Sequence, residues 1–142
     1  MEQHFRKLER LYINAPINHL YKPEIKISEK QSEIKIEIKK EYLHAAQALH
    51  GAIYFKMLDD ATVFATNSIV EDFLLVTINF NIHFIRPVNS GAIKAVGKLT
   101  SHSKNLFVAE ARLYNDEGKE IAFGSGSLMK SKIALSETIG YK

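Results

Sequence analysis

The sequence has 142 residues, of which 46% are hydrophobic and 25% charged, and it contains no cysteine. These values fit one globular domain over residues 1–142, and the missing cysteines exclude disulfides and thiolate chemistry, as suits a reducing cytoplasm. The formal net charge of +3 arises from interspersed acids and bases, which argues against a nucleic-acid partner. No apolar run approaches the roughly 20 residues of a membrane span, so we expect a cytoplasmic protein without a membrane partner.

The chain begins with a segment of helical periodicity. Phe5, Leu8, Leu11 and Tyr12 recur at helical spacing ahead of a proline, which disfavours continuation of the helix. We therefore expect residues 1–20 to form a helical arm that packs against the rest of the domain.

Two short segments, 25–27 and 34–38, follow, with isoleucines that alternate with polar residues. This pattern predicts an antiparallel hairpin with one buried and one solvent-facing side. From about residue 52 to residue 69 the period becomes helical, with apolar side chains around most of the helical wheel. Such a helix has to be enclosed by other elements.

Four more strands are predicted beyond the helix. The clearest covers residues 76–84, where apolar and polar residues alternate, and the others cover 92–100, 107–114 and 119–130. In the last strand, glycines two residues apart on one face indicate close approach of another segment. The expected fold is α+β, with an antiparallel sheet of about six strands wrapped around one long helix.

Two adjacent carboxylates interrupt the long helix. Asp60 lies four residues after Lys56, so an ordinary solvent-exposed ion pair explains its presence. Asp59 lies about 100° around the helix from Asp60 and nearer the apolar side. It is either an aspartate at the rim of the solvent face, neutralised by Lys56, or a functional carboxylate.

The pair His50-Gly51 precedes the same helix. Gly51 would let a ligand approach backbone N–H groups that have no intrahelical acceptor, where the helix dipole favours negative charge. Such a site can act as an oxyanion hole. The pair can also mark no more than a helix boundary.

The stretch HGAIYFKMLDDA, residues 50–61, follows two predicted strands and precedes a strand that ends in FIRPV. In this arrangement residues 25–130 resemble the hotdog-fold acyl-CoA thioesterases of the phenylacetic-acid-degradation (PaaI-like) group. Those proteins carry an Asn shortly before His-Gly-Gly and an acidic residue about two helical turns later. The resemblance implies a hotdog fold and hydrolysis of acyl-CoA without a metal, with coenzyme A present only as part of the substrate.

The resemblance also assigns roles by position. Gly51 N–H would polarise the thioester carbonyl, His50 would help to place it, and Asp59 would act as general base or nucleophile. Thr77 stands where several members carry a Ser or Thr that orients water. His44 takes the place of the usual Asn, either as a hydrogen-bond donor to the thioester or as a cap of its own loop.

In the family that the chain resembles, this site lies between two protomers, which implies a homodimer or a dimer of dimers. Gly51 and Asp59 are about 12 Å apart along one helix, too far to share one carbonyl. Thr77 alternates with the apolar residues of its strand, so we expect it to reach the site only if the strand end lies at the protomer junction.

Five further residues are candidates for substrate contact. Ala52 replaces the second Gly of the family pattern, and Tyr54, Phe55 and Leu58 are expected to line the acyl pocket. Arg86 could meet the phosphates of coenzyme A or be an ordinary solvated charge.

Two other functions stay open. A hotdog dehydratase or hydratase also pairs a His with a carboxylate, but the Pro-Gly-rich turn of those enzymes is missing before this helix. A non-catalytic acyl-CoA-binding module would keep the groove without turnover, and the His44 substitution favours it. The six histidines are too scattered along the sequence to suggest a metal site.

Overall fold

One antiparallel sheet of six strands dominates the computed structural model, which describes residues 1–142. The strands are β1 (Glu24–Ser28), β2 (Gln31–Glu37), β3 (Phe73–Phe84), β4 (Ala92–His102), β5 (Phe107–Tyr114) and β6 (Glu120–Ala134). Their order is β1-β2-β4-β5-β6-β3, and all neighbours are antiparallel. The predicted sheet is therefore confirmed, with β1 and β3 as its two edges.

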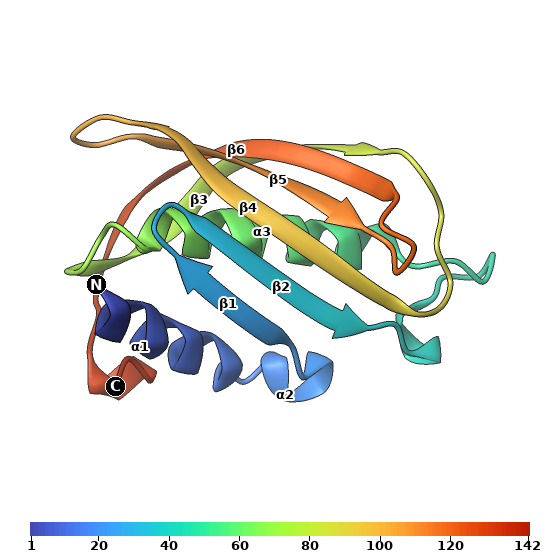
Figure 1. Ribbon diagram of the computed structural model, residues 1–142, viewed down its shortest axis with the longest axis horizontal. Coiled ribbons are helices and arrows are strands. Elements are labelled where there is room, and N and C mark those ends of the chain that lie inside the picture. The colour runs from blue at the N-terminus through green and yellow to red at the C-terminus, as the bar shows by residue number, and fades with distance from the viewer.

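The long helix α3 (Gly51–Asn67) lies across this sheet, and the strands curve over it (Figure 1). Gly97 of β4 lets the helix approach closely, because a Cβ there would lie 2.3 Å from the carbonyl oxygen of Ala61. The hydroxyl of Ser32 in β2 donates to the same oxygen at 2.6 Å. The enclosed helix and wrapped sheet are those of the predicted hotdog fold.

Apolar side chains from the helix, the inner face of the sheet and the arm form the main core. Its largest fully buried members are Leu8, Ile27, Ile34, Met57, Leu58, Ile93, Leu113 and Ile121. Burial of each such side chain stabilises the fold by about 1.5–3 kcal/mol. None of the helices combines the length and hydrophobicity that a bilayer-spanning segment requires.

The N-terminal arm contains α1 (Glu2–Ile13) and the short helix α2 (Asn18–Tyr21), and α1 lies beside β1 (Figure 1). The four apolar residues predicted to face the domain, Phe5, Leu8, Leu11 and Tyr12, are all buried. The remaining helices are single 3₁₀ turns, η1 (Lys40–Tyr42) and η2 (Glu137–Ile139).

The two chain ends meet near the C-terminal end of α3. His4 is buried and bonds through Nδ1 to the Tyr141 hydroxyl at 2.7 Å and through Nε2 to the carbonyl of Asn67 at 2.8 Å. Figure 1 shows the N- and C-termini on the same side of the molecule. The arm is therefore tied to the tail as well as to the sheet.

Strand β3 contains a bulge, seen as a register shift against β6 between Thr77 and Asn79. Before it, Thr77 contacts α3, and after it Phe80 and Phe84 also contact α3. A bulge inserts one residue and so lets an odd and an even position share a face. The strict alternation expected along this strand is therefore wrong at Thr77, because the bulge turns its side chain toward the helix of its own chain. That the strand also lies at a protomer junction stays a prediction.

The two glycines of β6 accommodate the ring of Phe80. A Cβ on Gly124 or on Gly126 would lie 2.6 Å from an atom of that ring. The close approach predicted from their spacing is confirmed. Held in this way, Phe80 packs against Phe55 of α3 with ring centroids 5.6 Å apart.

Candidate active site

The start of α3 is built by His50 and Gly51. His50 is extended (φ −64°, ψ 139°), and its Nδ1 accepts the N–H of Ala52 at 2.9 Å, so the imidazole caps the helix. Gly51 is the first helical residue and has no intrahelical acceptor for its own N–H. This N–H therefore remains available as a donor to a ligand.

A groove of about 440 Å³ lies beside this end of the helix. The loop before α3, its first turn and the segment after β3 form the walls. The lining residues are His44, Ala48, Leu49, Gly51, Tyr54, Phe84, Ile85, Arg86 and Pro87. Four predicted site residues, His44, Gly51, Tyr54 and Arg86, thus meet in one groove, whereas Asp59 is not among those that line it.

Asp59 lies two turns further along α3, against the bulged strand. Its Oδ1 accepts a hydrogen bond from Thr77 Oγ1 at 2.6 Å. Burial raises the pKa of Asp59 above its ordinary value, while the Thr77 hydroxyl opposes this effect. The charge of Asp60 raises the pKa further, and that of Lys56 lowers it. A carboxyl group with a raised pKa is better matched to work as a general base near neutral pH.

Asp60 forms the predicted ion pair with Lys56, at 2.6 Å, but the prediction that it is exposed is wrong. The carboxylate also accepts a hydrogen bond from the Tyr12 hydroxyl at 2.7 Å. The side chains of Lys56 and Asp60 are only 12% and 23% exposed. Residues of the arm cover both side chains. A helical wheel drawn for α3 alone could not predict this burial, because the arm is a different segment of the chain.

His44 is exposed, and its Nδ1 accepts the N–H of Ala46 at 3.0 Å, so it caps its loop as well as lining the groove. Its ring lies edge-on to that of His50, with centroids 6.4 Å apart. Both predicted roles, the donor and the cap, are compatible with this position.

The other predicted substrate contacts divide into two groups. Ala52 and Phe55 are exposed on the first turns of α3, and Tyr54 is buried behind the groove, where its hydroxyl donates to the carbonyl of Arg86 at 2.7 Å. Leu58 has no exposed surface and packs in the core. Its predicted place in the acyl pocket is therefore wrong, because its side chain is fully enclosed in the main core.

Phe84 is a groove residue that sequence reasoning missed. Its ring atoms lie 3.4 Å from the position of a Cβ on Gly51, and its centroid is 5.3 Å from that of Tyr54. The only signal was its place as the last apolar residue of an alternating strand. Alternation predicts on which face of the sheet Phe84 lies. It does not predict that the end of β3 lies beside the start of α3.

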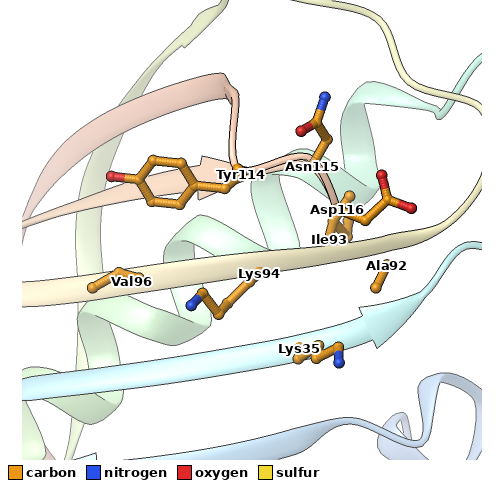
Figure 2. A pocket seen from close by; sticks show the side chains of 9 residues that line it. Lys35, Ala92, Ile93, Lys94, Val96, Tyr114, Asn115 and Asp116 are labelled. Carbon is orange, nitrogen blue, oxygen red and sulfur yellow. The ribbon is translucent and has the colours of Figure 1, made fainter.

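A second hollow, of about 460 Å³, lies on the outer face of the sheet. Figure 2 shows Lys35, Lys94, Tyr114, Asn115 and Asp116 around it. None of the site residues predicted from the sequence lines this hollow. The groove at the start of α3 is therefore the better candidate site.

The model of the thioesterase superfamily matches residues 46–122 of the chain. This match covers more than half of the sequence and contains most of the groove residues as well as Asp59 and Thr77. The chain belongs to the thioesterase superfamily.

Individual proteins agree with this assignment. A Thermoplasma acidophilum protein named "Putative esterase Ta0293" is 26% identical over 96 residues, which is 66% of this chain and 70% of that protein. The E. coli PaaI protein from the phenylacetic acid degradation operon superposes with a TM-score of 0.86 at 19% identity, over 95% of this chain and 98% of the other.

A mutant of the phenylacetic acid degradation protein PaaI from Thermus thermophilus superposes with a TM-score of 0.75 at 16% identity, over 82% of this chain and 100% of the other. At these identities the structures show that the fold is shared. The predicted hotdog fold and the resemblance to PaaI-like hotdog thioesterases are confirmed.

Proposed function

We propose that the protein hydrolyses acyl-CoA thioesters to a free acid and coenzyme A. One observation carries the proposal: in a chain of the thioesterase superfamily, the Asp59 carboxylate accepts a 2.6 Å hydrogen bond from Thr77. That bond fixes the carboxylate on a rigid helix while leaving its other oxygen to act on a reactant. The hydroxyl of Thr77, bonded to this carboxylate, would lie beside the same reactant.

In the proposed reaction, Asp59 takes a proton from water as the water oxygen attacks the thioester carbon. Alternatively the carboxylate attacks this carbon itself and forms an anhydride, which water then hydrolyses. Either path passes through a tetrahedral oxyanion, and Gly51 N–H at the positive end of the α3 dipole would stabilise it. Collapse of the oxyanion breaks the carbon–sulfur bond, and the thiolate of coenzyme A leaves and takes up a proton.

The proposed site requires a second copy of the chain. The groove beside Gly51 contains no carboxylate of its own, and Asp59 is about 12 Å away along the helix. Strand β3 supplies a means of association, because it pairs with β6 on one side only. An open edge strand of this kind is a template for pairing with another strand.

Antiparallel pairing of β3 with its copy would complete the site. A two-fold axis between Phe80 and Asn81 would bring Thr77 of each chain opposite Phe84 of the other. Because Thr77 contacts Asp59 and Phe84 covers Gly51, each carboxylate would then face the groove of the other protomer. We propose a homodimer, or a dimer of such dimers, on this basis.

Exposed apolar side chains beside the open edge support such pairing. Phe55, Ile78 and Phe84 are 43%, 52% and 59% exposed. Apolar groups gathered along one edge are typical of an association surface. Burial of these side chains against a second copy would remove apolar surface from water, and Phe84 would give the groove an apolar wall suited to an acyl chain.

The test is turnover by the purified protein of a panel of acyl-CoA thioesters that differ in length and aromaticity, followed by release of free thiol. We expect Asp59→Asn to lower kcat/KM by about 10²–10⁴-fold, with binding of the CoA ester retained in calorimetry. Asp116→Asn, at the outer hollow of Figure 2, is the matched control and should leave kcat/KM unchanged.

Two other results would replace the proposal. Binding of CoA esters by the wild type without thiol release from any of them would identify a binding module. Loss of water from a hydroxyacyl-CoA, or its addition to the unsaturated ester, without thiol release would identify a dehydratase or hydratase.

A further inference from the structure

The arm and α3 share a compact polar network centred on Lys56. The ammonium donates to the Tyr12 hydroxyl at 3.2 Å, to Asn18 Oδ1 at 2.8 Å and to Asp60 Oδ2 at 2.6 Å. These three bonds match the three donors of a lysine. The same cation lies 5.2 Å and 5.0 Å from the ring centroids of Tyr12 and Tyr21, where cation–π attraction adds to its hold.

The arm side of this network is itself fixed. Asn18 is 2% exposed, and its Nδ2 donates to the carbonyl of Tyr12 at 2.7 Å. The Tyr12 hydroxyl donates to Asp60 Oδ2 at 2.7 Å. Burial and the charge of Asp60 raise the pKa of Tyr12, so the phenol stays neutral. The arm therefore encloses the Lys56–Asp60 pair, which α3 brings together at i,i+4 spacing, without adding a charge of its own.

This pair lies next to the proposed catalytic carboxylate. Asp60 follows Asp59 directly, and Lys56 is one helical turn earlier. The titratable groups beside Asp59 are Lys56 and Asp60 on its own helix and Tyr12 on the arm. Strand β3 contributes Thr77, which does not titrate in water.

We propose that the arm clamps Lys56 and Asp60 as a balanced ion pair and thereby sets the charge around Asp59, which makes Tyr12, Lys56 and Asp60 positioning residues for the hydrolysis. The proposal rests on the function proposed above. If either member of the pair were lost, the other would act on Asp59 uncompensated. Tyr12 and Asn18 lie outside the residues 46–122 that match the family model, so the family match assigns no role to them.

The test compares Asp60→Asn with Lys56→Gln. We expect kcat/KM to rise with pH as Asp59 ionises, and this rise is the acidic limb of the pH profile. In Asp60→Asn the remaining ammonium should favour the ionised form of Asp59 and move the acidic limb to lower pH. In Lys56→Gln the remaining carboxylate should disfavour that form and move the limb to higher pH. Between about pH 4.5 and pH 7.5, the ratio of the two variants' kcat/KM should change by about tenfold.

Two further measurements separate charge from structure. Lys56→Arg keeps the cation and should restore the limb toward its wild-type position. Titration of the Asp59 carboxyl carbon by NMR should show the same opposite shifts without any turnover. A network that only holds the arm in place would lower the unfolding midpoint of both variants but would not shift their titrations in opposite directions.

The outcomes also distinguish this inference from the proposed function. Folded Asp60→Asn and Lys56→Gln variants whose Asp59 titrations coincide, or shift in the same direction, would overturn the inference even if thiol release is normal. Opposite NMR shifts in a protein that releases no thiol would sustain the electrostatic coupling and overturn the proposed hydrolysis. Should Lys56→Gln fail to fold, Lys56→Met provides the same loss of charge with an apolar side chain of similar length.

Discussion

The two edges of the sheet differ in what covers them. Strand β1 has five residues and lies beside α1. The backbone N–H and C=O of Ile27 in this strand both form hydrogen bonds with side chains of the arm. Its N–H donates to Glu9 Oε1 at 2.8 Å, and its carbonyl accepts from Arg6 at 2.8 Å. Strand β3 has twelve residues and no element beyond it. Since open edges invite pairing, the arm closes one edge and leaves the other as the place for a second copy.

The two adjacent aspartates of α3 face opposite edges of the sheet, Asp60 the edge covered by the arm and Asp59 the open edge at β3. Asp60 bonds to Tyr12 of the arm, and Asp59 bonds to Thr77 of β3. One carboxylate thus belongs to the closed, structural side of the helix and the other to the open side, where we propose the chemistry. Outside the Lys56–Asp60 pair, we therefore expect changes in the packing of the closed edge to affect mainly stability, and changes at the open edge to affect mainly assembly and turnover.

The largest effect is expected from a charge placed at the open edge. Ile78→Lys puts an ammonium into the apolar surface that a second copy would bury, so we expect dissociation and a fall in kcat/KM of about 10²–10⁴-fold, as for loss of a catalytic group. Light scattering and thiol release measure the two effects. Ile17→Lys on the arm is the matched control, because the two isoleucines are 52% and 53% exposed.

A monomeric Ile78→Lys protein with full turnover would show that each chain contains a complete site. Dissociation of Ile17→Lys but not of Ile78→Lys would reverse the assignment of the two edges. In that case the exposed apolar residues of the arm would form the interface.

At the closed edge we expect a loss of stability instead. Leu8 of α1 is fully buried, and Leu8→Ala should lower the free energy of unfolding by about 2–5 kcal/mol. Urea unfolding at one fixed protein concentration measures this, because the stability of an oligomer depends on concentration. Ile13→Ala, on the exposed side of the same helix, should change it by less than about 0.5 kcal/mol. Equal losses in both variants would show that α1 does not pack through the face that carries Leu8.

The elements of this fold could be predicted because each carries its own local pattern. Isoleucine alternation in β1 and β2 and the apolar wheel of α3 are properties of short segments. The contact between Tyr12 and Asp60 joins residues 48 positions apart, and no local pattern contains it. The same is true of Leu58, whose complete burial depends on core residues that are distant in the sequence.

The candidate site was predicted in its residue types but not in its geometry. A strict period of two in β3 placed Thr77 away from the helix, and the bulge before Asn79 reversed this. A bulge has no reliable sequence signal, because it depends on how the neighbouring strand is held. Here Phe80 over Gly124 and Gly126 of β6 holds the strand after the bulge.

The Thr77–Asp59 bond gives the next largest effect at the open edge. Thr77→Val removes the hydroxyl that opposes the rise of the Asp59 pKa. The pKa should therefore rise further, and the acidic limb of kcat/KM should move to higher pH. We expect a loss of about tenfold, the equivalent of one hydrogen bond to a charged group. Thr77→Ser keeps the hydroxyl and serves as the control, and an unshifted Thr77→Val profile would remove Thr77 from the site.

Asp59 should also cost the fold some stability near neutral pH. Its folded-state pKa is raised, so the unfolded chain loses the proton first as pH rises, and the stability of the wild type falls with it. The Asp59→Asn variant does not ionise at this position, so it does not lose this stability, and its side-chain oxygen can still accept the hydrogen bond from Thr77. We therefore expect its Tm to exceed that of wild type at neutral pH and to converge with it in acid below the ordinary carboxyl range. A lower Tm for Asp59→Asn at neutral pH would contradict the raised pKa.

The smallest effect is expected at His44, beside the groove. Its Nδ1 accepts the N–H of Ala46, and the side-chain oxygen of an asparagine can accept the same bond in a turn of this kind. We expect His44→Asn to keep its Tm and to keep kcat/KM within about threefold of wild type, less than the value of one ordinary hydrogen bond. The pH profiles of the two proteins should then superimpose.

If the ring instead donates in its charged form to the thioester or the leaving thiolate, wild-type turnover will decline at alkaline pH and His44→Asn will lack that decline. His44→Ala separates the loop from the chemistry, because it removes both the cap and any donor, and a fall in Tm without a change in the pH profile would leave His44 as a loop cap alone.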